Sequence, residues 1–456
     1  MFHDKRFYKS LITIATPIII QEFIMMFLNM VDVIMIGQLG EVSVAAVGLA
    51  NQISFLLILL LFGITTGSSV FMAQYWGQKN IAGVRKVLGI CLGIGLAGSL
   101  IFITAAFSIP ESMLRIYSKD PEVIRLGGQY LSIVGFSYLP MVLTFSYSAA
   151  LRSTENVKPP MFASIIALSL NTLLNYTLIF GNLGFPELGV QGAGIATVIS
   201  RLLESTILLL IVYIKRTPAA ARIRELINFN LEYLRTYFKT VLPVILNEVF
   251  WSLGITTYNI IYARINTASV AAVNIASTVE SVAFVLFFGI GNACAIMVGN
   301  LIGSKKEDRA FLYARRSLVL TISGGFIIGL LVFISAGWIP SLYNVSEETL
   351  QYTHNILRIA GLTIWIRASN ITLVLGILRS GGDTRYTLFI ELVCIWGIGV
   401  PMALLGAFVL HMPVYWVYLL VQGEEIVKMI LGITRLFSKK WIHDLSEPAA
   451  GVLAPP

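Results

Sequence analysis

Charged residues are scarce in this chain. Only 12% of its 456 residues are Asp, Glu, Lys or Arg, whereas hydrophobic residues make up 57%. Soluble domains carry about 25% charged residues, because their surfaces must be hydrated. The deficit excludes a soluble globular protein of this length and indicates a membrane protein that crosses the bilayer many times.

Cysteine and histidine are also rare, with three and four residues. The cysteines lie scattered in apolar segments without the C-x-x-C spacing of redox or zinc sites, so we interpret them as small buried hydrophobic residues: Cys91, Cys294 and Cys394. The histidines all fall near the chain ends or at the ends of apolar segments: His3, His354, His411 and His443. We find no phosphate-binding loop and no nucleophile with a matching base. We therefore expect no enzyme, no catalytic residue and no cofactor; an intramembrane enzyme is the alternative from another functional class.

Positive charge is concentrated in particular loops. The net charge is +8, and most Lys and Arg residues fall in the N-terminal segment, the even-numbered loops and the C-terminal segment. This positive-inside pattern predicts a multi-pass protein of the plasma or inner membrane with both termini cytoplasmic, and it makes a nucleic-acid partner improbable. Lys5, Arg6 and Lys9 precede an apolar run too long for a signal peptide, so the first span should be retained. Arg152 and Arg379 should lie at cytoplasmic helix ends, where they would contact phosphate or lipid headgroups.

Apolar runs of about 20 residues, the length that crosses a bilayer as a helix, occur twelve times. They lie near residues 11–36, 44–72, 88–110, 127–150, 160–182, 189–214, 241–264, 270–300, 316–341, 352–378, 386–410 and 413–437. The sequence therefore predicts an all-α membrane protein with twelve transmembrane helices.

The two halves of the chain repeat one another at a constant offset of 226 residues. The pentapeptide SVAAV occurs at Ser43–Val47 and again at Ser269–Val273, and Pro17 and Pro243 open the corresponding spans. Each half contains six spans, an even number, so both halves enter the membrane in the same sense. We therefore expect two six-helix lobes that are related by a pseudo-twofold axis along the membrane normal and flank a central cleft.

This repeat also predicts the domain boundaries. The N-lobe should comprise residues 1–214 and the C-lobe residues 241–442, joined by a cytoplasmic linker over 215–240, with the tail 443–456 set apart from the fold. Within the linker, Ala221–Lys239 is basic and amphipathic, which predicts a short helix on the inner membrane surface.

Asp32 is the candidate for binding a cation. A carboxylate near the middle of a span costs about 2.5–3.5 kcal/mol on insertion scales, so it should face a cavity or a partner. Asn171 and Asn175 stand one turn apart on the fifth span and could offer neutral oxygens beside it, which suits Na⁺ or a proton. The alternative is that both asparagines bridge helices by hydrogen bonds, with Asp32 as acceptor. The position 226 residues after Asp32 is Tyr258, so we expect only the N-lobe to carry a carboxylate at this depth.

Four further ionisable residues are candidates for substrate binding. Glu22 and Glu248 occupy equivalent places in the two halves, and Glu280 lies in the eighth span. These acids could neutralise a cationic substrate, and Arg367 in the tenth span could hold one C-lobe acid when the site is empty. The alternative is a static Glu–Arg pair that only fixes helix packing.

Two other groups of charged residues are interpreted as local ion pairs. Arg201 and Glu204 are spaced i and i+3 in the sixth span. Glu424 and Glu425 precede Lys428 by one turn in the last span.

Several motifs together resemble one known family. They are VDVIMIGQLG at Val31–Gly40, AQYWGQKN at Ala73–Asn80, LRSTENVKPP at Leu151–Pro160, NTLLNYTLIFG at Asn171–Gly181, LRSGGDTR at Leu378–Arg385 and RLFSKKW at Arg435–Trp441. With these motifs the chain resembles the multidrug and toxic compound extrusion (MATE) transporters over all but its tail. The resemblance implies a monomeric two-lobed antiporter that exports amphiphilic, usually cationic organic compounds in exchange for Na⁺ or H⁺.

The chain departs from that family at three places. The sodium-linked branch generally carries a glutamate where this chain has Trp251, and an aspartate in the tenth span, where Arg367–Asn370 stand here. These differences speak against a C-lobe ion site of that kind. In the fifth span, Asn175 replaces the aspartate of some members, so a proton site made of two aspartates is absent, and Na⁺ and H⁺ both stay open.

A lipid-linked oligosaccharide flippase of the same superfamily is the alternative within transport. Such a protein should have a more basic central cleft. The predicted cleft carries several acids against a single arginine, which favours export of organic cations.

Overall fold

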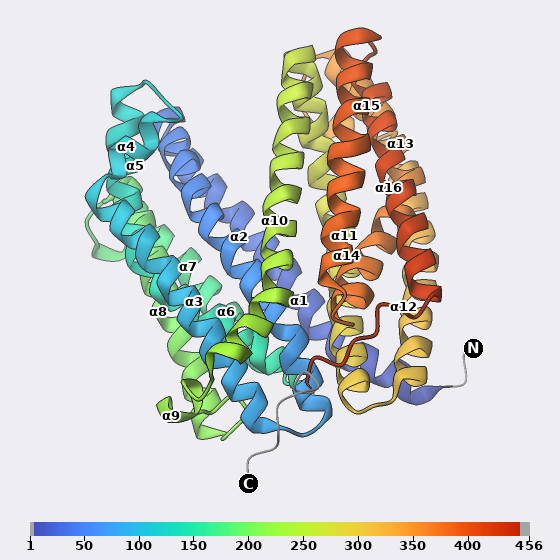
Figure 1. Ribbon diagram of the computed structural model, residues 1–456. Helices are drawn as coiled ribbons and strands as arrows, with labels where there is room; N and C mark the ends of the chain where they lie inside the picture. The colour runs from blue at the N-terminus through green and yellow to red at the C-terminus, as the bar shows by residue number, and fades with distance from the viewer. Residues whose placement is uncertain (1–3, 447–456) are drawn as a thin grey trace. The chain divides into compact units, whose positions relative to one another are not determined.

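The computed structural model describes residues 4–446, and within this range the chain is helical, with one isolated β-bridge between Gly382 and Ile442 (Figure 1). The α-helices of the first half are α1 Lys5–Gly37, α2 Glu41–Gly77, α3 Ile81–Ser108, α4 Pro110–Arg115, α5 Pro121–Val134, α6 Tyr138–Ser153, α7 Lys158–Phe180 and α8 Gly189–Ile214. Those of the second half are α9 Ile223–Leu226, α10 Leu231–Ile265, α11 Thr267–Gly303, α12 Glu307–Ser335, α13 Glu347–Ile371, α14 Thr384–Glu391, α15 Val400–Leu404 and α16 Val414–Phe437. Short 3₁₀ turns are η1 Gly135–Ser137, η2 Asn182–Gly184 and η3 Pro340–Leu342, and π-helical segments are η4 Thr372–Arg379, η5 Leu392–Gly399 and η6 Leu405–Val409.

Eleven helical segments of the described chain are long and apolar enough to cross a membrane. Three of them combine several elements, since Pro121–Ser153, Glu347–Arg379 and Thr384–Val409 each contain a 3₁₀ or π-helical stretch. The twelfth predicted span is α16, whose 24 residues suffice in length but include four charged side chains. All twelve predicted segments are thus helices, and most extend beyond the apolar run into the adjoining turns.

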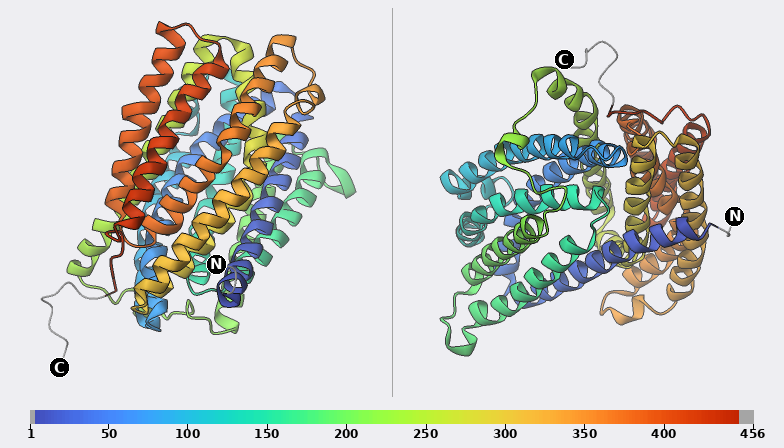
Figure 2. Two further views of the ribbon diagram at one scale, coloured as in Figure 1. Left: turned by 90° about the vertical axis from the view of Figure 1, so that its right-hand side faces the viewer. Right: turned by 90° about the horizontal axis from the view of Figure 1, so that it is seen from below.

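The chain forms two compact units. Unit 1 comprises Met1–Ile19, Ala73–Gln78 and Phe238–Pro456, and unit 2 comprises Ile20–Met72 and Lys79–Tyr237. In unit 2, α3 packs on α6 and α8 packs on both α5 and α7. In unit 1, α13 packs on α11, α12 and α16, as the bundle of yellow to red helices in Figure 2 shows. The lobe boundaries inferred from the repeat, and the axis between the lobes, stay predictions.

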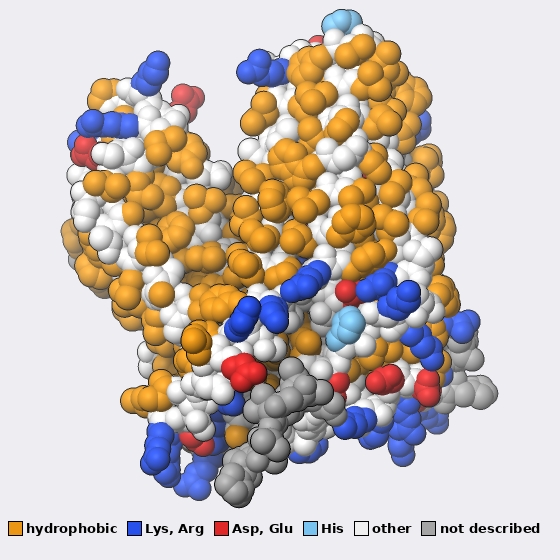
Figure 3. Space-filling model, in the orientation of Figure 1, with side chains coloured by type: hydrophobic (Ala, Val, Ile, Leu, Met, Phe, Trp, Pro, Cys, Tyr) orange, Lys and Arg blue, Asp and Glu red, His pale blue; other side chains and the backbone are white. Residues whose placement is uncertain are grey.

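Surface composition in each unit matches a membrane-spanning bundle. On the face seen in Figure 3, hydrophobic side chains cover the middle of each unit, and Lys and Arg gather toward its ends. Inside unit 1, one apolar core is built on α10, α11, α13 and α16, and its members include Tyr258, Phe287, Ile364 and Val417.

The linker contains no single amphipathic helix, so that prediction is wrong. Helix α9 has only four residues, and α10 begins at Leu231 because the side chain of Asn230 accepts a hydrogen bond from the Tyr233 amide at 2.9 Å. Glu225 accepts hydrogen bonds from the Arg222 amide and the Arg85 guanidinium at 2.7 and 2.6 Å, and these bonds lower the pKa of its carboxyl. The segment is therefore fixed onto α3.

Two glycines that the repeat pairs allow a close approach of helices within unit 1. A Cβ at Gly77 would lie 2.1 Å from the carbonyl oxygen of Asn300, and a Cβ at Gly303 would lie 1.9 Å from that of Gln74. Gln74 and Asn300 are themselves 226 residues apart, so the contact is reciprocal. These glycines are required for packing of the helix ends of α2 and α11.

Gly303→Ala should therefore lower the thermal stability of the purified protein, by roughly 1–3 kcal/mol for an overpacked contact. Gly37→Ala is the matched control, because a Cβ at Gly37 meets nothing within 4 Å. Melting curves in detergent would measure both; equal melting temperatures for the two variants would contradict the packing role of Gly303.

Candidate functional site

Asp32 on α1 and the two asparagines on α7 meet inside unit 2. Asn175 Nδ2 donates to Asp32 Oδ1 at 2.9 Å. The amide of Asn171 is best satisfied when its nitrogen donates to Asp32 Oδ2 at 2.8 Å and its oxygen accepts from the Thr197 amide at 3.3 Å. The predicted three-residue cluster is thus present, and each carboxylate oxygen receives one hydrogen bond.

One oxygen of this cluster lacks a donor. Asn175 is 2% exposed, and its Oδ1 is buried without a hydrogen-bond partner among the described residues. Buried amide oxygens are rarely left unpaired, because the desolvation cost is not recovered. Arg201 on α8 also interacts electrostatically with Asp32. The cluster therefore offers a small cation a carboxylate and an unpaired neutral oxygen. The hydrogen bonds from the asparagines to Asp32, which the structural alternative predicts, are present as well.

A chain of buried polar groups continues from Arg201 toward α1. Arg201 Nη1 pairs with Glu204 Oε2 at 2.8 Å, as the sequence predicts, and Ser164 Oγ donates to the other carboxylate oxygen at 2.6 Å. Gln21 Nε2 donates to Ser164 at 2.9 Å, and Arg152 Nη2 donates to Gln21 Oε1 at 2.9 Å. Ser164 and Gln21 were not among the predicted site residues, since neither is charged.

Arg379 and Glu248 form the corresponding contact in unit 1. Arg379 is 1% exposed, and its two terminal nitrogens donate to Glu248 Oε1 and Asn247 Oδ1, both at 2.8 Å. The expectation that Arg379 contacts phosphate or headgroups is therefore wrong. Gln21 and Asn247 are equivalent in the repeat, and the recurrence of LRS at Arg152 and Arg379 was the signal that could have revealed these contacts.

Glu280 on α11 is held by two partners. Arg367 Nη1 lies 2.7 Å from Glu280 Oε1, and the Tyr418 hydroxyl donates a short hydrogen bond to the same oxygen. The Arg367 guanidinium also stacks over the Phe284 ring, 4.8 Å from its centroid. Arg367 thus pairs with one of the C-lobe acids that were predicted to bind substrate, Glu280. Glu22 is half-buried on α1 and interacts electrostatically with Arg152.

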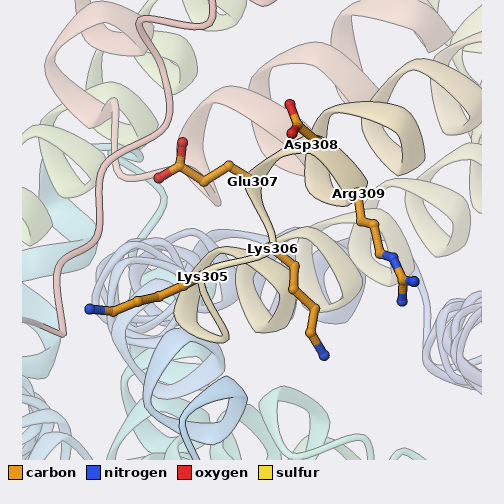
Figure 4. Close-up of a pocket in the computed structure, with 5 residues that line it drawn as sticks. All are labelled: Lys305, Lys306, Glu307, Asp308 and Arg309. Carbon is orange, nitrogen blue, oxygen red and sulfur yellow. The ribbon is translucent and has the colours of Figure 1, made fainter.

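Neither a metal-binding cluster nor a surface hollow of the described chain offers an alternative site. Among residues 4–446 no group of three or more His, Cys, Asp or Glu side chains could hold a metal ion. A surface hollow is lined by Lys305–Arg309 at the turn between α11 and α12 (Figure 4). Figure 4 shows these side chains pointing in different directions, so they do not converge on a ligand.

A chain of long apolar helices with buried, partnered ionisable groups belongs to the class of multi-pass membrane transporters. Comparison with known proteins places it more closely: the chain belongs to the MatE family, whose model matches residues 17–177 and 243–405. The two matched segments begin at Pro17 and Pro243, the prolines that the internal repeat pairs. Members of this family are transporters, and the chain is therefore not an enzyme.

Relatives match it over nearly their whole length. The uncharacterized transporter YisQ of Bacillus subtilis is 27% identical over 446 residues, 96% of each chain. The probable multidrug resistance protein NorM of Thermotoga maritima is 23% identical over 95% of this chain and 93% of its own. Among solved structures, a mutant of the MATE transporter VcmN of Vibrio cholerae superposes with a TM-score of 0.87 at 19% identity, over 96% and 98% of the two chains. A MATE structure in complex with MaL6 gives 0.84 at 20% identity, over 95% and 97%. These structures share the fold.

Proposed function

We propose that this transporter is a secondary active antiporter that exports amphiphilic organic cations in exchange for Na⁺ or H⁺. The observation that carries the proposal is the Asp32 cluster, a carboxylate inside a membrane-spanning helix with a donor on each oxygen and an unpaired amide oxygen beside it. The relative NorM of Thermotoga maritima is named a probable multidrug resistance protein, and this supports organic compounds as the substrate class.

Asp32, Asn171 and Asn175 are the proposed coupling site. An ionised carboxylate in a span is costly, so occupancy by a cation or proton lowers the free energy of one conformation of unit 2. For exchange, ion and substrate must favour different conformations, since a ligand with equal affinity for both shifts neither. The unpaired Asn175 Oδ1 would suit either ion, since an amide oxygen can coordinate Na⁺ or accept a hydrogen bond from a protonated carboxyl.

The proposed substrate site is centred on Glu280 and Arg367, with Glu22 and Glu248 as further acids. In the observed arrangement Arg367 neutralises Glu280. A cationic substrate would replace the guanidinium as the partner of this carboxylate. Glu248 is already paired with Arg379, so its contribution to binding depends on release of that pair.

The proposed localisation is a plasma or inner membrane with both termini cytoplasmic, and the proposed oligomeric state is a monomer. The distribution of Lys and Arg supports the orientation.

Purified protein in liposomes, loaded with ethidium and given an imposed Na⁺ or pH gradient, tests the proposal and separates the two ions. Ethidium movement that follows either gradient supports antiport. Movement that ignores both gradients contradicts it.

Glu280→Gln should weaken binding of cationic dyes by about tenfold or more while leaving neutral dyes nearly unaffected, because only a charged ligand loses a Coulombic partner. Binding isotherms of a cationic and a neutral dye of similar size would measure this. Glu307→Gln, which neutralises an exposed acid at the start of α12, is the matched control. Equal losses for both dyes would instead indicate that the Glu280–Arg367 pair only fixes helix packing.

A further inference from the structure

A second cluster of ionisable side chains is buried in unit 1, and one of its members, Glu425, interacts electrostatically with Arg367 of the Glu280–Arg367 pair. We define the α16 acid cluster as the carboxyls of Glu391, Glu424 and Glu425. Glu391 at the end of α14 and Glu424 on α16 are each 4% exposed. From their spacing alone, Glu424, Glu425 and Lys428 are expected to form only local ion pairs.

The charges in this cluster do not balance. Lys428 Nζ lies 3.3 Å from Glu391 Oε1 and 3.9 Å from Glu425 Oε1, so one ammonium serves two carboxylates. In the described part of the chain, no Lys or Arg nitrogen comes within 4.0 Å of the Glu424 carboxylate. Its partner is the Tyr258 hydroxyl, which donates at 2.5 Å. Burial of a surplus negative charge costs several kcal/mol in general, so three ionised carboxylates with one lysine are unfavourable here.

A buried amide oxygen beside the cluster lacks a hydrogen-bond donor. Asn370 on α13 is 4% exposed, and its Nδ2 donates to Glu425 Oε2 at 2.6 Å and to the Glu425 carbonyl at 2.8 Å. Its Oδ1 is buried and has no donor among residues 4–446. A protonated carboxyl or a water molecule would supply that donor. The ammonium of Lys428, already lying among the acids, would repel a metal cation, which favours a proton over Na⁺.

The internal repeat relates one contact of this cluster to the position of Asp32. Tyr258 is the residue 226 positions after Asp32, and its hydroxyl reaches the Glu424 carboxylate. Helix α16 thus brings a carboxylate to the residue that the repeat pairs with Asp32, whereas the expectation of a single carboxylate at this depth stays a prediction. Gly399 at the end of the π-helical segment η5 makes room for it: a Cβ there would lie 1.9 Å from the Tyr258 hydroxyl and 2.1 Å from Glu424 Oε2. Such segments often occur at functional sites.

We propose that the α16 acid cluster holds one exchangeable proton, carried chiefly by Glu424, at a site separate from Asp32. The titratable and charged groups that face it from the surrounding helices are Tyr258, Tyr262, Glu280, Arg367, Glu391, Cys394, Glu425 and Lys428. Release of the proton adds one negative charge to unit 1 and so favours a cation at Glu280. The effect of proton release on cation binding at Glu280 rests on the proposed antiport. The existence of the proton site does not depend on it.

Infrared difference spectra of the purified protein between acid and alkaline pH would test the site directly. Wild-type protein should show the carbonyl stretch of a protonated, buried carboxylic acid, which Glu424→Gln removes and Asp32→Asn retains. Glutamine can still accept the hydrogen bond of Tyr258, so the variant should fold. An unchanged acid band in a folded Glu424→Gln protein would overturn the proposal.

Tyr258→Phe provides a second, independent measurement. It leaves the Glu424 carboxyl in place but removes its hydrogen-bond donor, so the band should persist at a shifted frequency. A band at the wild-type frequency in this variant would overturn the assignment to Glu424. Glu307→Gln, at an exposed acid, should leave the spectrum of the buried acid unchanged. Neither spectrum needs a transported substrate, so the result is independent of whether antiport itself is demonstrated.

Discussion

Asp32→Asn should reduce gradient-driven dye efflux to the background level while the protein still folds and inserts. The substitution removes the carboxylate charge of the proposed coupling site, so ion occupancy can no longer favour one conformation over another. Folding should survive because an asparagine at this position can still accept a hydrogen bond from Asn175 or Asn171, and no buried cation loses a bonded partner. Efflux from cells or liposomes at matched protein level would measure the effect.

Glu41→Gln is the control for Asp32→Asn, because it neutralises an exposed acid at the start of α2 in the same unit. Its efflux should equal that of the wild type. Efflux at the wild-type rate in Asp32→Asn would refute the coupling role of Asp32. The C-lobe acids would then be the remaining candidates for the coupling-ion site.

Arg379→Leu should destabilise the protein more than any other substitution considered above, by roughly 3–5 kcal/mol as expected when one partner of a buried ion pair is removed. The guanidinium is buried, and its loss would leave Glu248 and Asn247 without their donors. Thermal unfolding in detergent, or the fraction of protein that stays monodisperse after heating, would measure the change.

The double variant Arg379→Leu with Glu248→Leu should recover much of that loss, since it leaves no uncompensated charge. Arg115→Leu is the matched control, because Arg115 pairs with Glu111 at 3.6 Å on an exposed surface and such pairs contribute about 0–1 kcal/mol. Equal stability of Arg379→Leu and Arg115→Leu would show that the Arg379–Glu248 contact is not required for the fold.

Local features of the sequence were sufficient for the membrane class, the twelve segments and the internal repeat. Segment length and hydropathy decide whether a helix crosses a bilayer, and neither depends on what the helix packs against. The same reasoning identified Asp32, because a carboxylate within a span is conspicuous wherever its side chain points. Local ion pairs such as Arg201 with Glu204 were predictable for a similar reason, since one helical turn brings the two side chains together.

Only the tertiary structure decided which distant groups meet. Whether Arg379 reaches Glu248, or Tyr258 reaches Glu424, depends on the rotation of each helix about its axis and on its height beside its neighbours, and hydropathy sets neither. Those contacts join residues 131 and 166 positions apart. Because of the first contact, Arg379 is a buried structural cation and not the expected headgroup ligand. Because of the second, Glu424 belongs to a candidate proton site and not only to the expected local ion pair. The role of a buried charge depends on its partners, and its place in the chain does not reveal them.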